Sequence, residues 1–101
     1  MTWSKHDWEK RVKEIARNSG NVVWTNHAQQ QMKKRHITFA MATDVLCRGI
    51  IHKEPEQDIR TGHMICRMER YCAGANIAIC AALESEQACD IIVVTAIRFG
   101  D

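Results

Sequence analysis

The spacing of apolar residues changes near residue 50, and this change constrains the fold more than any other feature of the chain. Before Ile50, apolar residues recur every three or four positions, as in amphipathic helices. After Ile50 they alternate with polar residues, as in strands with one buried face. Helices followed by closely spaced strands predict an α+β fold, in which the N-terminal helices pack on a C-terminal antiparallel sheet of about four strands.

Capping residues and glycines mark the ends of three predicted helices. The predicted spans are Ser4 to Gly20, Thr25 or Asn26 to Arg35, and Thr38 to Gly49. The short apolar run 22–24 between the first two helices is either a lone strand or an extended connector.

Four strands are predicted after the helices, at 50–54, 63–72, 77–83 and 89–99. Pro55 ends the first, a polar loop occupies 56–62, and residues 73–76 form a hairpin turn. Polar side chains on the uncovered sheet face should mark a concave surface. These side chains are His63, Arg67, Glu69 and Arg98.

The length of 101 residues predicts a single domain over 1–101, with an extra N-terminal helix at 1–20 and a core at 22–99. The chain has no apolar run near the roughly 20 residues that span a bilayer and no apolar signal core at its start, so we expect a cytoplasmic protein without membrane contact. Five cysteines without a Cys-x-x-Cys pair predict reduced, buried thiols rather than disulfides. No Cys/His spacing indicates a metal site, and no motif indicates a cofactor.

Basic residues cluster at Lys33, Lys34, Arg35 and His36, although the net charge is only +2. Such a run is either a solvated helix face or a patch that contacts phosphates. His27, in the first turn of the same helix, is either a local hydrogen-bonding residue or a general base. Arg35 lies about 12 Å further along the helix axis. Arg67 either pairs with Glu69 across the sheet face or stabilises the phosphorane formed during RNA cleavage.

Three segments resemble a known family. The run 25–38, TNHAQQQMKKRHIT, resembles the T-x-H-A-x-x-R-M-x-x-R-G-I pattern of the domain of unknown function 4258 family of small prokaryotic proteins. The run 45–51, VLCRGII, resembles its V-L-x-x-G-x-I-I pattern, and 91–97, IIVVTAI, resembles its terminal V-V-I-T-V-Y strand.

The resemblance implies a compact α+β fold similar to RelE-like bacterial toxin nucleases, which are metal-independent RNases. His27, Arg35 and Thr95 occupy matching polar positions. On this hypothesis His27, Arg35 and Arg67 form the catalytic group. RNA contacts would come from further basic side chains, namely Lys33, Lys34, His36 and Arg98.

Three positions depart from the family pattern: Gln31 replaces an arginine, His36 a glycine, and Ile97 the expected tyrosine. Two hypotheses therefore stand. In the first, a toxin-like domain of a toxin–antitoxin or mobile-element system cleaves or binds RNA. In the second, favoured by the missing tyrosine, a non-catalytic module binds a protein partner, such as an antitoxin or an inhibited target. A homodimer joined through an exposed strand edge is a third possibility.

Overall fold

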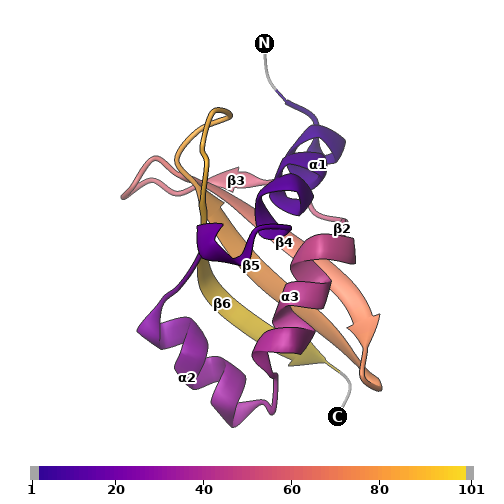
Figure 1. Cartoon of the computed structure of the whole chain (residues 1–101). Helices are drawn as coiled ribbons and strands as arrows, with labels where there is room; N and C mark the ends of the chain where they lie inside the picture. Colours follow the sequence, from indigo (N-terminus) through magenta and orange to yellow (C-terminus); the bar gives the residue numbers. More distant parts are fainter. Residues whose placement is uncertain (1–2, 100–101) are drawn as a thin grey trace.

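The computed structural model describes residues 3–99; residues 1–2 and 100–101, which the predicted domain includes, lie outside it. The fold is α+β, as predicted, with three helices before most of the sheet (Figure 1). The helices are α1 (Lys5–Ala16), α2 (Asn26–Lys34) and α3 (Phe39–Arg48), and a short 3-10 turn, η1 (Ser19–Asn21), follows α1. The strands are β1 (Val22–Trp24), β2 (Ile50–Ile51), β3 (Glu56–Gln57), β4 (Met64–Cys72), β5 (Ala75–Leu83) and β6 (Ile91–Phe99).

The helices begin at predicted capping residues. The Ser4 side chain accepts a hydrogen bond from the backbone N–H of Asp7, whose carboxylate accepts one from the Ser4 N–H in return. The Thr25 and Thr38 side chains accept hydrogen bonds from the backbone N–H groups of Ala28 and Met41 and cap α2 and α3. The first helix is shorter than predicted, because it ends at Ala16 and the chain passes through η1 before it enters the sheet.

The sheet has six strands and is mixed, whereas the sequence predicted about four antiparallel strands. The main path is β1-β6-β5-β4-β2, and β3 also pairs with β4. Two features cause the difference. The run 22–24 joins the sheet parallel to β6. The strand predicted at 50–54 is shortened to β2, and β3 forms within the predicted polar loop 56–62, so that two short strands pair with β4.

One face of the sheet is covered and the other is open. Figure 1 shows α1 and α3 packed across the sheet, with α2 alongside β6. The core lies between these layers and includes Val12, Leu46, Met68 and Ile79. In the described residues, no helix is long and apolar enough to cross a bilayer.

Gly49 allows α3 and β4 to approach closely. A β-carbon at this position would collide with the backbone oxygen of Val45 and lie 3.0 Å from that of Glu69. The glycine that ends the predicted third helix is therefore required by packing, in addition to ending the helix.

Candidate functional site

Helix α2 lies along the edge of β6 that β1 leaves unpaired. β1 pairs only with residues 91–93 of β6. The Thr25 hydroxyl donates a 2.8 Å hydrogen bond to the Val93 carbonyl, and the Arg35 guanidinium donates a 2.6 Å bond to the Ala96 carbonyl. The Val93 carbonyl also accepts a hydrogen bond from the backbone N–H of Thr25, whereas the Arg35 side chain satisfies a carbonyl of β6 beyond the residues that pair with β1.

Arg35 and Arg98 hold the end of α2 in place. Besides Ala96, the Arg35 guanidinium donates to the side-chain oxygen of Gln31. Arg98 donates to the backbone carbonyls of Arg35 and His36, each at 3.2 Å. The prediction that Arg98 lies on the uncovered sheet face is wrong. It pairs in register with Ile77, which belongs to the covered core, so its side chain lies on the helix side.

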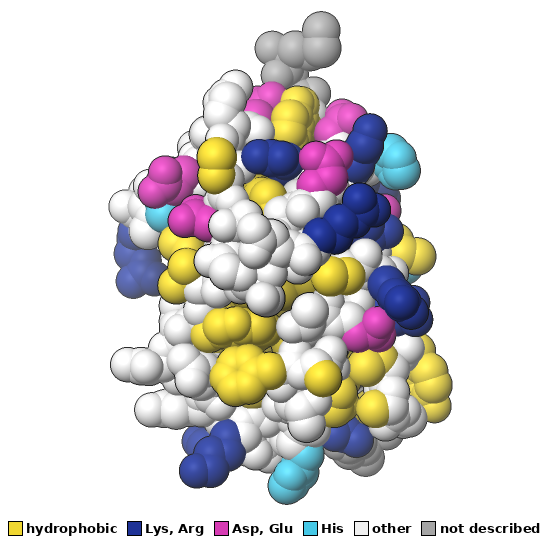
Figure 2. Space-filling model, viewed as in Figure 1, with side chains coloured by type: hydrophobic (Ala, Val, Ile, Leu, Met, Phe, Trp, Pro, Cys, Tyr) yellow, Lys and Arg dark blue, Asp and Glu magenta, His cyan; other side chains and the backbone are white. Residues whose placement is uncertain are grey.

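The exposed positive charge of this region lies where α2 ends. We call the surface formed by Lys33, Lys34, Arg35, His36 and Arg98 the basic corner; Lys33, Lys34 and His36 are exposed, and the two arginines are half-buried. The sequence has no Asp or Glu between Glu14 and Asp44. Figure 2 shows Lys, Arg and His side chains at this end of the molecule, while most of the visible acidic side chains lie toward the other end.

A Schellman motif shapes the basic corner. The Ile37 N–H donates to the Met32 carbonyl at 2.8 Å, and the His36 N–H donates to the Lys33 carbonyl at 3.4 Å. His36 has φ of +56°, in the left-handed region. The two side chains that flank the motif, Met32 and Ile37, are buried, so the helix end is anchored in the core.

A groove of about 600 Å³ runs between α2 and the start of α3, next to the basic corner. Its lining comprises Asn26, Gln29, Gln30, Met32, Lys33, Ile37, Thr38 and Phe39. Phe39 is 52% exposed, and its ring packs edge-on against Trp24 at 5.0 Å between centroids. The sequence does not reveal this groove, because an apolar residue such as Phe39 at the start of an amphipathic helix is expected on the buried face. Phe39 is the first residue after the capping Thr38, where a side chain need not follow the buried stripe.

His27 is exposed in the first turn of α2, at the opposite end of the helix from the basic corner. Between them Gln31 is half-buried and accepts the Arg35 hydrogen bond. The helix therefore separates the predicted base from the predicted cation by about 12 Å along its axis.

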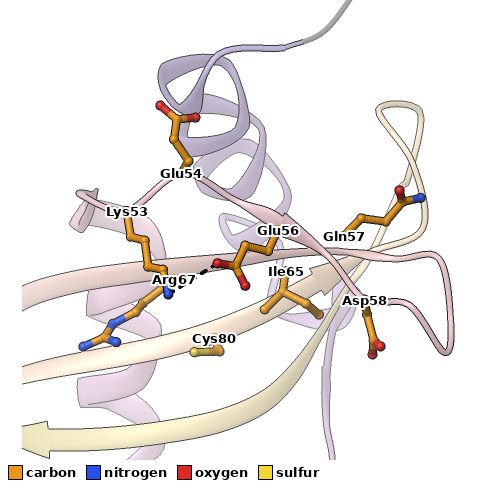
Figure 3. Close-up of a pocket in the computed structure, with 8 residues that line it drawn as sticks. All are labelled: Lys53, Glu54, Glu56, Gln57, Asp58, Ile65, Arg67 and Cys80. Carbon is orange, nitrogen blue, oxygen red and sulfur yellow. Dashed lines mark ion pairs between the residues drawn. The ribbon is translucent and has the colours of Figure 1, made fainter.

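Arg67 lies on the open face of the sheet, away from α2. Its guanidinium is 3.8 Å from the Glu69 carboxylate and 5.1 Å from the centre of the Phe99 ring. A hollow of about 290 Å³ adjoins it, and Figure 3 shows Arg67, Ile65 and Cys80 on the strands, with Glu56 above them and Asp58 to one side. Three carboxylates line this hollow against two cations, so it disfavours a phosphate. The lining carboxylates are Glu54, Glu56 and Asp58, and the cations are Lys53 and Arg67.

The other predicted residues of the terminal strand also face the open side. Thr95 and Ile97 pair in register with Cys80 and Ala78, on the face that carries Arg67. Tyr71 lies on this face too, 66% exposed. The structure therefore brings Arg35, Arg98 and the α2 lysines together, but it places Arg67 and the tyrosine hydroxyl on the opposite side of the sheet from α2.

The five cysteines are free thiols. Burial raises the pKa of the Cys66 thiol to about 12 and also raises the pKa of Cys80. Thiols with raised pKa stay protonated at neutral pH and are weak nucleophiles. The prediction that the cysteines are buried holds for Cys66, but Cys89 is exposed. Within residues 3–99, no three His, Cys, Asp or Glu side chains converge as metal ligands would.

Comparison with known proteins gives one match. A family model described as "Domain of unknown function (DUF4258)" matches residues 24–98, from the end of β1 almost to the end of β6. No curated protein and no solved structure matches the chain. The matched range does not include α1.

Proposed function

The chain belongs to the family described as domain of unknown function (DUF4258), and from the surface that this core presents we propose that it binds single-stranded RNA through the basic corner and the adjoining groove. The observation that carries the proposal is the concentration of exposed cations in a segment without acids. Lys33 and Lys34 project from the last turn of α2, and no Asp or Glu occurs between residues 14 and 44. Clustered lysines bind the phosphate backbone and release its counterions.

The groove supplies the features that favour a single strand over a duplex. Unpaired bases stack on exposed aromatic side chains and hydrogen-bond through their edges. Phe39 offers a half-exposed ring, and Gln29 and Gln30 offer amide groups that both donate and accept. Lys33 lines the same groove, so a base on Phe39 would keep its phosphate near a cation.

We propose binding rather than cleavage as the primary activity, because the groups that cleavage needs are dispersed. RNA cleavage requires a base, a cation and an acid around one phosphate. Arg35 and Arg98 donate hydrogen bonds to backbone carbonyls, and Arg67 lies on the opposite side of the sheet from the helix that carries His27. The proposal keeps RNA, the partner that the toxin-like resemblance implies, and replaces cleavage with binding as the primary activity.

The test is the affinity for a fluorescein-labelled oligouridylate of about 12 nucleotides, measured by anisotropy as salt is varied. Lys33→Ala/Lys34→Ala should weaken binding roughly tenfold or more near 0.1 M salt and make the salt dependence shallower by about one to two phosphates. The matched control is Lys10→Ala/Arg60→Ala, which removes the same charge from exposed sites outside the corner.

The proposal fails if the native protein does not bind the oligouridylate, or if both double variants lose the same affinity.

Replacement of the Phe39 ring tests the contribution of the groove separately from that of the lysines. Phe39→Leu keeps an apolar contact for Trp24 and should lower the affinity for the oligouridylate several-fold without changing the salt dependence.

His27→Ala tests the enzyme hypothesis and should leave binding of the same RNA unchanged. If the native protein cleaves this RNA and the variant does not, the enzyme hypothesis is restored.

A further inference from the structure

The open face of the sheet carries most of the exposed large hydrophobic side chains of the described residues. Six large hydrophobic side chains are substantially exposed among residues 3–99, and four of them lie on this face. The four are Val23, Ile50, Tyr71 and Phe99, with exposed fractions of 47%, 52%, 66% and 36%. Single exposed apolar side chains are ordinary, but a concentration of them on one sheet face favours an interaction surface.

Strand register arranges this face in rows. Near one end, Val23, Ile92, Ala82 and Ile65 lie side by side across four strands. At the other end, Tyr71, Asn76 and Phe99 form a second row. Between the rows, β4 carries Arg67 and Glu69, two residues apart on the same face and 3.8 Å from each other.

This face carries charges of both signs, without an excess of cations. Arg67 is matched by Glu69, and at the border Lys53 pairs with Glu56 at 3.4 Å. A polyanion requires an excess of positive charge, which the basic corner has and this face lacks. A surface that carries both signs in adjacent positions is complementary to itself when turned by a two-fold rotation.

We propose that the open sheet face binds a second copy of this chain, forming a two-fold symmetric dimer in which two sheets pack face to face. A two-fold axis between the sheets, perpendicular to β4 and opposite Met68, reverses the strand direction in the second copy. Arg67 and Glu69 lie on either side of Met68 along β4, so the rotation places Arg67 of each copy opposite Glu69 of the other. The row that contains Tyr71 and Phe99 faces the row that contains Ile65 and Val23, so apolar groups meet at both ends.

This dimer buries the apolar side chains that the open face exposes to water in the monomer. Two sheets packed face to face interdigitate their side chains at a separation of about 10 Å and bury the apolar rows. The partly buried Arg67–Glu69 pair gains a second partner of opposite charge when the face is desolvated, which a buried ion pair needs. The proposal is independent of RNA binding, because α2 and the basic corner lie outside the open face.

Sedimentation velocity tests the dimer over a concentration series that reaches about 100 µM, where a dimer with a Kd of roughly 10 µM is mostly assembled. The native chain should sediment as a dimer. Ile50→Lys places a charge in the apolar surface at a position that is already 52% exposed in the monomer, so the variant should fold and sediment as a monomer. Ile59→Lys makes the same chemical change at a loop site that is 99% exposed, and it should remain dimeric.

A charge exchange tests the symmetry. Arg67→Glu and Glu69→Arg should each be monomeric alone, because like charges face each other in both homodimers. An equimolar mixture should form a heterodimer, because each reversed charge then meets its opposite in the other chain. This recovery also shows that neither variant is misfolded.

A native chain that stays monomeric at the highest concentration overturns the proposal, and the open face would then bind a different protein. Two variants that stay monomeric when mixed overturn the two-fold pairing.

Discussion

At the scale of single residues, His36 adopts a backbone conformation that its side chain disfavours. Its φ of +56° lies in the left-handed region, which costs a residue with a β-carbon roughly 1 kcal/mol. The family pattern has glycine here, and the Schellman motif explains why: position C′ of a helix is the usual place for a left-handed glycine.

His36→Gly should therefore raise the free energy of unfolding by about 0.5–1 kcal/mol, although glycine also increases the entropy of the unfolded chain. Urea denaturation measures the change. His36→Ala is the control, since alanine keeps the β-carbon and hence the strain. Equal stability of the two variants would show that the backbone conformation is not the cause.

Residues whose roles depend on neighbours in sequence were predictable, and residues whose roles depend on distant contacts were not. Ser4, Thr25 and Thr38 cap helices through hydrogen bonds to backbone N–H groups three residues away, so local sequence predicts them. Arg35 and Arg98 resemble phosphate-binding residues in sequence. Their partners are carbonyls more than 60 positions away, and only the packing of α2 on β6 reveals them.

At the scale of elements, the spacing of apolar residues predicts the helices and the long strands, but it does not predict the short strands at the edges of the sheet. β2 and β3 have two residues each, too few for any alternation to show. β1 has three, and its parallel pairing with β6 joins segments almost 70 positions apart. Both edges of the sheet depend on these short strands, which explains why the sequence predicted too few strands and no parallel pair.

Helix α2 substitutes for a strand along β6, and Arg35 is the side chain that secures its end. Arg35→Ala would leave the Ala96 carbonyl without its donor and release the end of the helix. We expect a loss of about 2–3 kcal/mol in the free energy of unfolding, since both lost hydrogen bonds come from a charged donor. Lys34→Ala, at an exposed neighbouring site, should change stability by less than about 0.5 kcal/mol.

The same pair of variants separates structural from binding roles. If Arg35 acts mainly on structure, Arg35→Ala should melt earlier, yet at a temperature where it is folded it should lose less RNA affinity than Lys34→Ala. The reverse order, with a stable Arg35→Ala protein that no longer binds RNA, would return Arg35 to the role of a phosphate contact. Thermal denaturation and anisotropy on the same samples give both quantities.

At the scale of the whole molecule, the sheet separates two surfaces of different chemistry. The helix side carries the basic corner, and the open side carries exposed apolar side chains and charges of both signs without an excess of cations. The proposed two-fold axis runs across the strands and in the plane between the sheets, so β6 of one copy lies over β6 of the other. Both α2 helices then come to the same edge of the dimer and run in opposite directions, which gives one particle two RNA sites along one edge.

Two sites on one edge predict a dependence on RNA length. An oligouridylate of about 30 nucleotides can engage both sites, whereas one of about 10 can engage only one, so the native protein should bind the longer RNA at least tenfold more tightly per molecule. Ile50→Lys, as a monomer, should bind the short RNA as the native chain does and lose most of the gain on the long one. If Ile50→Lys keeps the full gain, the preference comes from independent monomers along the strand. If Ile50→Lys also loses the short RNA, the open face takes part in RNA binding and the two surfaces do not act separately.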